Sequence, residues 1–297
     1  MDIRLLRYFL AVAREEHISR AAKTLHISQP TLSRQLMELE RELNSQLFLR
    51  SSGNRRVVLT AEGVLLRKRA EEILDLVART ESELIDAREH LRGDVYIGSG
   101  ETHVVSLLSK VIKDVQARSP AIHFHLFSGN AEAVTERLDN GLIDFGILAD
   151  PCDISKYDFL GLPAADTWGL LLATDHPLAA KQSIRPQDLG GLPLIASSQR
   201  LTDDLLSDWL GADFAKLNLV ATYTLLYNAS LLVKVGVGCA LGLDKIVDTS
   251  KDSGLCFRPL DPALKARWHI VWKKGQVFSK AAAYFLQDLQ DEFEKRA

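Results

Sequence analysis

The stretch that most constrains the fold of this chain is Ile18–Leu43, which contains two short helical patterns separated by a tight turn. Ser19 stands where it can cap the first helix, and Ser28 stands where it can cap the second. Pro30 falls in the first turn of the second helix, where no backbone donor is missed. Four leucines recur at helical spacing and predict one buried face for this helix: Leu32, Leu36, Leu39 and Leu43.

The opposite face of the second helix carries polar side chains. Successive residues are rotated by about 100° around a helix, so six side chains point away from the leucines or lie beside them. Such groups can hydrogen bond to base edges and phosphates, as the second helix of a helix-turn-helix requires. The alternative is a helical hairpin with a solvated polar face. The six side chains are Gln29, Thr31, Ser33, Arg34, Met37 and Arg41.

The charge of the chain is unevenly distributed along its length. The net charge is −3, which by itself argues against a nucleic-acid-binding protein. Residues 1–60, however, contain ten Lys/Arg and six Asp/Glu and carry +4, so the other 237 residues carry −7. A basic end on an acidic body is expected when only one module meets DNA phosphates.

The segment after the two helices, Gln46–Leu59, reads as a β-hairpin wing. Gly53-Asn54 marks a turn between two short apolar stretches, and Arg55 and Arg56 sit at the predicted tip. Arginines on an exposed hairpin are often simply solvated. Beside a recognition helix, they are instead expected along the DNA backbone or in the minor groove.

Two further helices are predicted around this unit. A first helix, about Ile3–Glu16, can pack under the two-helix unit. A long helix, capped by Thr60, is predicted from Ala61 to Leu91; it is too long for a small domain and too charged to be buried all round. Its apolar stripe is expected to pair with another subunit, which would place two recognition helices on successive turns of DNA. The stripe includes Val64, Leu65, Ile73, Leu74, Val77, Leu84 and Leu91.

From Gly93 onward, short apolar strands alternate with helical patterns, which predicts parallel strands with helices on the faces of a sheet. The strands form two sets, and 266–272 with a final helix at about 279–295 returns to the first set. Two lobes result, joined by crossings near 162–166 and 264–267, with a ligand cleft between them at the carboxyl ends of the strands. The other predicted strands are 95–97, 122–127, 145–148, 169–173, 194–196, 220–224 and 239–243; the other helices are 102–118, 131–140, 202–210 and 228–235.

Several classes of protein are disfavoured by the composition. No apolar run approaches the ~18 residues of a membrane span, so no membrane partner is expected. Residues 1–19 have charges on both sides of their apolar residues and no cleavage-site pattern, which disfavours a signal peptide. Cys152, Cys239 and Cys256 are too widely spaced for a disulfide framework or a metal site and favour a reducing, cytoplasmic location.

The order of winged helix-turn-helix, long helix and two-lobed α/β domain resembles the LysR-type transcriptional regulators over essentially the whole chain. The resemblance is strongest in AAKTLHISQPTLSRQLMELERELNSQLFLR (21–50) and then in RVVLTAEG (56–63). It is weaker in HPLA (176–179) and VGVGCALGL (235–243). The chain departs from the family at Leu243-Asp244, where a Leu-Pro is usual; the departure affects the expected local turn and not the fold.

This resemblance implies an α/β fold with an N-terminal all-α winged helix-turn-helix and a two-lobed, periplasmic-binding-protein-like effector domain. The implied domains are 1–60 for DNA binding, 61–91 for the linker helix and 92–297 for effector binding. Lobe I spans about 92–163 and 266–297, and lobe II about 164–265. The positions that match the family's DNA-contacting residues are Gln29, Pro30, Thr31, Ser33 and Arg34 in the major groove, and Arg55 and Arg56 near the minor groove.

The resemblance also implies partners and a mode of control. We expect a DNA-binding transcriptional regulator with no enzymatic activity and no cofactor, controlled by a small-molecule effector of unknown identity in the cleft. The expected partners are double-stranded DNA, RNA polymerase and further copies of the chain, as a dimer or a dimer-of-dimers tetramer. A symmetric dimer predicts an interrupted palindrome as the binding site.

The residues expected to hold the effector lie at strand ends. Ser99-Gly100 allows a backbone close to a ligand, and Thr102 lies at a helix N-terminus, which favours an anion. Glu101 would repel an anion, neutralise the helix dipole or bind an amine, so the charge of the effector stays open. The hydroxyls could also be helix caps only. The full set is Ser99, Gly100, Glu101, Thr102, Ser128, Gly129, Ser197, Ser198 and Thr202.

Other functions find weaker support in the sequence. His123 and His125 share one face of a strand but lack a third metal ligand, and Ser99 lies in no nucleophile elbow. Redox sensing needs a reactive cysteine with a resolving partner, and neither Cys152 nor Cys239 fits. An enzyme or transport-type binding protein on the two-lobed domain is the rival hypothesis, and a DNA-binding protein with an empty cleft is a third.

Overall fold

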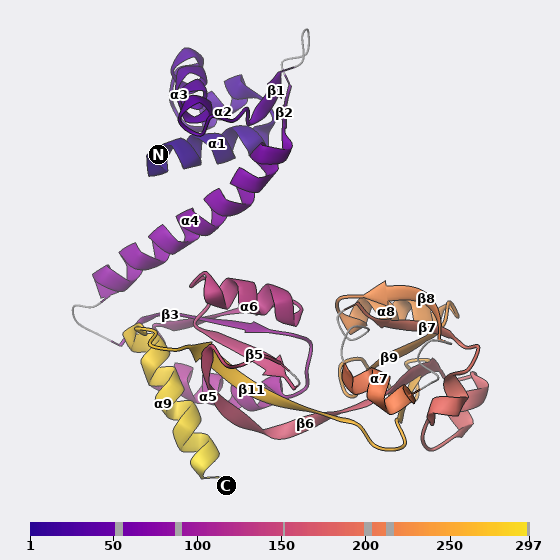
Figure 1. The fold of residues 1–297 in the computed structure, drawn as a ribbon. Coiled ribbons are helices and arrows are strands. Elements are labelled where there is room, and N and C mark those ends of the chain that lie inside the picture. The colour runs from indigo at the N-terminus through magenta and orange to yellow at the C-terminus, as the bar shows by residue number, and fades with distance from the viewer. Residues whose placement is uncertain (51–55, 87–90, 151, 199–203, 212–216, 296–297) are drawn as a thin grey trace. The chain divides into compact units, whose positions relative to one another are not determined.

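A computed structural model of the chain describes residues 1–50, 56–86, 91–150, 152–198, 204–211 and 217–295. The chain divides into two compact units, Met1–Arg88 and Glu89–Ala297, and each is described by itself (Figure 1).

The N-terminal unit is a three-helix assembly with a short hairpin. Its helices are α1 (Ile3–Glu15), α2 (Ile18–Thr24) and α3 (Gln29–Glu42); strands β1 (Phe48–Arg50) and β2 (Val57–Leu59) pair antiparallel. The predicted cap of α3 is confirmed, because the Ser28 hydroxyl accepts a hydrogen bond from the Thr31 amide at 3.3 Å. The predicted cap of α2 is wrong. This helix already begins at Ile18 after His17, so Ser19 lies inside it.

Three of the four leucines predicted to be buried on α3 are in the core of this unit. Leu32, Leu36 and Leu39 are at most 1% exposed, and each contributes about 1.5–3 kcal/mol through burial. Leu43 is 37% exposed, which corrects the prediction, because it follows the last turn of α3 as the C-cap and so no longer continues the buried face of the helix. The core also contains Leu5, Leu6, Phe9, Val12, Ala21, Ala22, Leu47, Phe48 and Val57.

Helix α4 (Ala61–Asp86) follows the hairpin and is 26 residues long. The Thr60 hydroxyl accepts from the Gly63 amide at 2.9 Å and donates to the Gln46 carbonyl at 2.7 Å, so it joins the helix to the hairpin. Gly63 is required here, since a Cβ would lie 2.2 Å from the Leu47 carbonyl oxygen. Leu91 was predicted to end the apolar stripe of this helix but packs on the core of the second unit.

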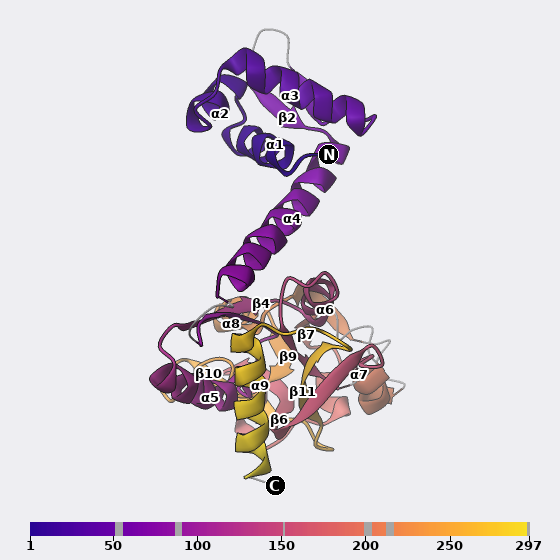
Figure 2. The same cartoon turned by 90° about the vertical axis from the view of Figure 1, so that its left-hand side faces the viewer.

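The first lobe of the second unit is built on parallel strands. These are β3 (Gly93–Ser99), β4 (Ile122–Ser128) and β5 (Phe145–Ala149), in the spatial order β4-β3-β5. Helices α5 (Val105–Arg118) and α9 (Lys280–Glu294) cover one face of this sheet, and α6 (Ala131–Asp139) covers the other (Figures 1 and 2). Phe145 is fully buried and stacks on Phe278 with 5.1 Å between ring centroids. The return of the last helix to lobe I is thereby confirmed.

The second lobe contains the strands β9 (Cys239–Leu243), β7 (Pro193–Ser197) and β8 (Asn218–Tyr223), in that spatial order. Strands β9 and β7 pair in parallel, as do β7 and β8. Helix α7 (Asp204–Leu210) follows β7 in the chain, and helix α8 (Leu226–Lys234) follows β8. Strand β10 (Leu255–Pro259) and two 3-10 turns, Pro177–Ala180 and Pro186–Leu189, were not predicted. Strand β10 pairs antiparallel with β6, and the turn Pro177–Ala180 packs beside both strands; the turns are too short to show a helical periodicity.

The two lobes share continuous strands where connecting segments were predicted. Strand β6 (Tyr157–Ala173) runs unbroken from one lobe into the other, and β11 (Lys265–Lys273) pairs antiparallel beside it and beside β5. The register between them shifts between Arg267 and His269, where the two strands cross from lobe to lobe. The predicted crossings at 162–166 and 264–267 fall within or at the end of these strands. No helix among the described residues is long and apolar enough to cross a membrane.

Candidate functional site

The first turns of α3 present the predicted DNA-contacting side chains to solvent. Gln29, Pro30, Thr31 and Arg34 are exposed and Ser33 is half-buried. The Thr31 hydroxyl lies 2.7 Å from the Ser28 hydroxyl, so part of its hydrogen-bonding capacity is already used by the cap of the helix. The four exposed side chains therefore form a polar surface at the start of a capped, rigid helix.

Arg34 differs from neighbouring arginines in its surroundings. It forms no ion pair within the part of the chain that the structure describes. Arg41 lies about two helical turns further along α3, and the Glu38 carboxylate is 3.7 Å from its guanidinium. An exposed cation without a carboxylate partner keeps its full charge and all of its donors for a phosphate or a base edge.

Of the two predicted wing arginines, Arg56 lies among the described residues. Arg55 lies outside the described residues. Arg56 does not extend freely from a hairpin tip, because its guanidinium contacts the Glu16 carboxylate through Nη2 at 2.5 Å and Nε at 2.7 Å. This contact and the backbone bond from the Val57 amide to the Glu16 carbonyl tie the hairpin to the end of α1.

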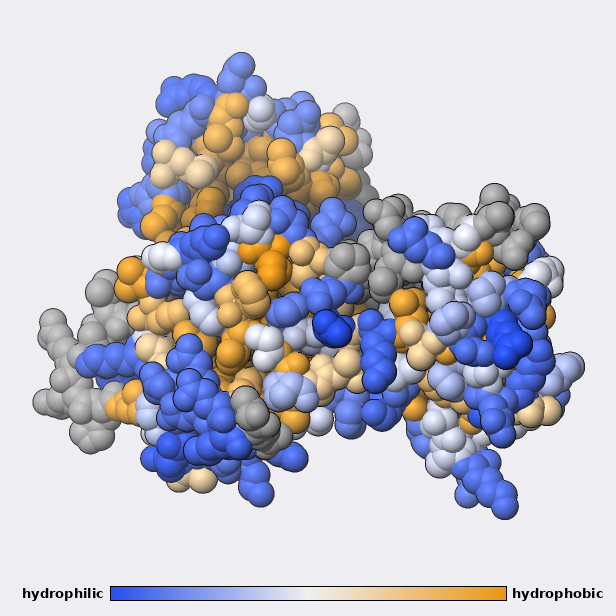
Figure 3. Space-filling model, turned by 60° about the horizontal axis from the view of Figure 1, so that its bottom comes forward, coloured by the Kyte–Doolittle hydropathy of each residue, from blue (hydrophilic) through white to orange (hydrophobic). Residues whose placement is uncertain are grey.

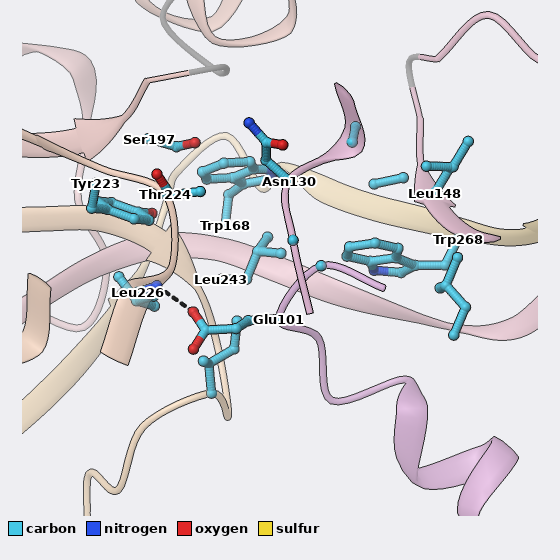
Figure 4. A pocket seen from close by; sticks show the side chains of 16 residues that line it. Glu101, Asn130, Leu148, Trp168, Ser197, Tyr223, Thr224, Leu226, Leu243 and Trp268 are labelled. Atoms are coloured by element: carbon cyan, nitrogen blue, oxygen red, sulfur yellow. Dashed lines mark hydrogen bonds between the residues drawn. The ribbon is translucent and has the colours of Figure 1, made fainter. Parts of the chain in front are cut away.

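A second candidate site is a pocket of about 90 Å³ between the lobes of the second unit (Figure 4). Leu148 and Trp268 lie on the side of lobe I, and Ser197, Tyr223 and Thr224 lie on the side of lobe II. The wall combines aromatic and aliphatic groups with a few hydroxyls and one carboxylate. The lining residues are Gly100, Glu101, Gly129, Asn130, Ala131, Ile147, Leu148, Ala149, Trp168, Ser197, Tyr223, Thr224, Leu226, Leu243, Ile246 and Trp268.

Four of the nine residues predicted for the effector line this pocket: Gly100, Glu101, Gly129 and Ser197. Ser99 is 5% exposed and donates its hydroxyl to the Gly100 carbonyl at 2.7 Å, so it faces its own backbone. Ser128 and Ser198 are exposed and do not line the pocket. Thr202 lies outside the described residues.

Thr102 is directed into the protein rather than into the pocket. Its hydroxyl donates to Asp166 on β6 and accepts from the Val104 amide at 3.0 Å, so it joins the start of α5 to the strand that connects the lobes. Asp166 is 1% exposed, and this burial raises the pKa of its carboxyl even though the Thr102 hydrogen bond acts to lower it. The Thr102 hydroxyl therefore binds a buried carboxyl of the protein itself. Asp166 was missed, since a single acidic residue inside a strand pattern carries no spacing signal.

The sequence left the role of Glu101 open, and the structure shows which groups its carboxylate contacts. Its carboxylate accepts hydrogen bonds from the backbone amides of Leu226 and, at 3.4 Å, Tyr227, which open helix α8 in the opposite lobe (Figure 4). Of the alternatives considered, neutralisation of a helix dipole is the one observed. The helix, however, is α8 and not the neighbouring α5.

The two tryptophans in the wall were also missed by the sequence prediction. Trp168 on β6 and Trp268 on β11 are 4% and 5% exposed, and each comes from a strand shared by both lobes. Their positions in apolar strand patterns are typical of core residues, so no sequence signal distinguished them. Asn130 is a third addition; it caps α6 by accepting from the Ala133 amide at 2.9 Å.

Burial disfavours the thiolate form of two thiols in the second unit, Cys239 and Cys256. Burial raises the pKa of Cys239 to about 11, and burial also raises the pKa of Cys256. Cys239 lies on β9 and Cys256 on β10, on opposite sides of β6, and all three cysteines are free. Among the described residues, no group of three or more His, Cys, Asp or Glu could hold a metal ion.

Two family models together match almost the whole chain. Residues 3–64 match the model described as "Bacterial regulatory helix-turn-helix protein, lysR family", and residues 88–294 match "LysR substrate binding domain".

Curated relatives and solved structures resemble the chain over its full length or most of it. The Hca operon transcriptional activator HcaR of Escherichia coli strain K12 is 29% identical and covers 93% of both chains. The transcriptional dual regulator OxyR of the same strain is 33% identical over 66% of this chain and 63% of its own. A crystal structure of full-length CbnR with its target DNA is 20% identical, covers 98% of this chain and 99% of that chain, and has a TM-score of 0.73. At this identity, the structural likeness concerns the fold alone.

Proposed function

Because the chain belongs to the LysR family of DNA-binding transcriptional regulators with a small-molecule effector domain, we propose that α3 reads its target DNA. The single observation that carries this proposal is the exposed Arg34, which has no ion-pair partner among the described residues, beside Gln29, Pro30 and Thr31 on a capped helix. A recognition helix places its N-terminal residues against base edges in the major groove. Ser33 is a flanking contact, and the two wing arginines, Arg55 and Arg56, are proposed near the minor groove. Arg56 would have to exchange Glu16 for a phosphate there.

We propose the pocket between the lobes as the effector site, with Gly100, Glu101, Gly129 and Ser197 as its residues from the predicted set. Ser99, Thr102, Ser128, Ser198 and Thr202 are not retained as direct contacts. A volume of about 90 Å³ is below the ~300 Å³ of a typical ligand pocket, so the lobes would open to admit anything but a small molecule. The wall of Trp168, Trp268 and Leu148 favours an effector with a flat apolar part.

Self-association is supported by apolar side chains that α4 leaves exposed. Val64, Leu65 and Leu76 are 44–62% exposed on a helix that packs in its own unit on α1 and β2. Figure 3 shows that apolar side chains gather in patches on the surface, and such patches are typical of interfaces. We infer a dimer through α4, assembled further into a tetramer, bound to an interrupted palindrome.

The remaining parts of the proposal follow from the role in transcription. Such a regulator would act in the cytoplasm, where the DNA is, and would act on RNA polymerase without being an enzyme and without a cofactor. The domain boundaries proposed are 1–60, 61–91 and 92–297, with lobe I at about 92–163 and 266–297 and lobe II at about 164–265.

A peroxide-sensing function is not favoured, although several relatives are hydrogen peroxide-inducible genes activators. Sensing by a thiol depends on the thiolate, and a raised pKa disfavours the thiolate of Cys239 and Cys256 at neutral pH.

The effector proposal is tested by thermal-shift screening of the full-length protein with small metabolites. Gly100 has room for a side chain, since a Cβ would meet only ordinary contacts at 3.7 Å and 3.8 Å, and it lines the pocket. We expect Gly100→Val to abolish any ligand-induced shift while DNA binding is kept. Gly190→Ala is the control, because Gly190 has similar room outside the pocket. A ligand that shifts the melting temperature of Gly100→Val as much as that of the unmodified protein would place the effector elsewhere.

A further inference from the structure

Helix α8 begins without a capping group of its own. Its N-cap residue, Leu225, makes no side-chain hydrogen bond, and no acidic residue lies in its first turn. The amides of Leu226 and Tyr227 are the first of the helix and therefore have no intrahelical acceptor. Both point to one carboxylate oxygen, Oε2 of Glu101.

The residue that caps α8 comes from the other lobe. Glu101 follows β3 in lobe I, and α8 follows β8 in lobe II; 125 residues separate Glu101 from Leu226. A carboxylate at a helix N-terminus is favoured both by the free amides and by the helix dipole. The contact lies in the wall of the pocket, where both residues are partly screened from water.

Glu101 lies away from the strands that join the lobes. Strands β6 and β11 provide the covalent connection and would flex together where their register shifts. By contrast, the bond from Glu101 to α8 can break without any change in these strands. Opening of the lobes requires its loss, since its two ends belong to different lobes.

We propose that Glu101 is a latch that holds the two lobes closed by capping α8 from the opposite lobe. The latch forms part of the wall of the pocket, so a bound ligand and the closed latch compete for the same space. This last step rests on the proposed effector site, whereas the latch itself does not.

The latch is tested by amide hydrogen exchange of the full-length protein. In the unmodified protein, the Leu226 and Tyr227 amides are expected to be protected from exchange by Glu101, although a helix alone would leave them open. Glu101→Ala is expected to raise their exchange by about ten- to a hundredfold, as loss of a charge-assisted hydrogen bond implies. Glu132→Ala is the matched control: it removes an exposed carboxylate from the first turn of α6, which does not bridge the lobes, and should leave α8 unchanged.

Chemical rescue distinguishes loss of the Glu101 carboxylate from a general effect of shortening the side chain. Glu101→Ala removes a carboxymethyl group, so acetate is expected to restore protection of the two amides, whereas acetamide at equal concentration is not. Glu101→Gln keeps the shape and should give intermediate protection, which provides a readout if the alanine variant is unstable. Fast exchange of both amides in the unmodified protein, or equal rescue by acetate and acetamide, would overturn the latch.

Binding of each variant to target DNA is measured alongside. If the exchange results fail while binding to DNA persists, the latch is wrong and the regulatory function stands. If the exchange results hold while the protein binds no DNA site, the latch is retained and the regulatory function is wrong.

Discussion

Replacing Arg34 by alanine tests the assignment of α3 most simply. Arg34 is exposed and forms no ion pair within the described residues, so its removal leaves no carboxylate unpaired and opens no cavity. The free energy of unfolding should therefore change by no more than about 0.5 kcal/mol. Any loss of DNA binding then reports on the interface and not on the fold.

The expected loss follows from the contacts that an arginine at this position can make. A phosphate contact or a bidentate contact to guanine contributes about 1–3 kcal/mol, which raises Kd about 5- to 150-fold per half-site. The measurement is fluorescence anisotropy of labelled operator DNA at a fixed salt concentration. Repeating it across salt concentrations distinguishes the contacts, because loss of one phosphate contact lowers the salt slope by about 1.

Arg41→Ala is the matched control on the same helix. Arg41 lies in the last turn of α3 with Glu38 3.7 Å away, so its charge is partly compensated and it is distant from the N-terminal turns. We expect a much smaller change in Kd for this variant. An unchanged Kd for Arg34→Ala, or an equal loss for Arg41→Ala, would refute the assignment of the recognition surface.

Three further predictions concern the folded state. Leu36→Ala should lower the free energy of unfolding by about 2–5 kcal/mol in urea, because Leu36 is 1% exposed, whereas Leu43→Ala at a 37% exposed position should cost far less. Asp166→Asn should raise the free energy of unfolding at about pH 7, since burial raises the pKa of Asp166 in the folded state. Stability contributed by such a group is fully present below the pKa of the unfolded state and is lost as pH rises through the folded pKa. The difference between Asp166→Asn and the unmodified protein should therefore shrink between about pH 7 and about pH 4, which urea titrations at both pH values would show. Thr102→Val should destabilise the second unit in the same assay, because it leaves the Asp166 carboxyl without its hydroxyl donor.

Each of these predictions has an outcome that would contradict it. Equal costs for Leu36→Ala and Leu43→Ala would show that burial on α3 is not as described. A difference between Asp166→Asn and the unmodified protein that grows at low pH would mean that the pKa of Asp166 is lowered on folding. A Thr102→Val variant as stable as the unmodified protein would remove Thr102 as a structural partner of Asp166.

The N-terminal unit could be predicted well because its signals are local. The Ser28 cap, the Pro30 position and the leucine spacing all act within a few residues of one another, so the sequence alone places them. The errors occur at helix ends. Ser19 lies two residues after the actual N-cap, His17, and Leu43 lies one residue after the end of α3; the local pattern tolerates either position.

The effector site could be predicted only in part. Strand ends were located correctly, but the direction of each hydroxyl depends on contacts from distant segments. Thr102 turns toward Asp166, 64 residues away, and the Glu101 carboxylate finds its partner 125 residues away. The pairing of β6 with β11 likewise places Trp168 and Trp268 in the wall of one pocket. The spacing of residues within either strand does not predict this pairing.

We propose that this chain recognises a specific DNA sequence through α3 as a symmetric oligomer. The most direct test is selection of binding sites by the full-length protein from a pool of random-sequence DNA, repeated with Arg34→Ala. We expect the unmodified protein to enrich an interrupted palindrome and the variant to lose that enrichment. A pool that remains unenriched, or the same palindrome recovered equally well by Arg34→Ala, would contradict it.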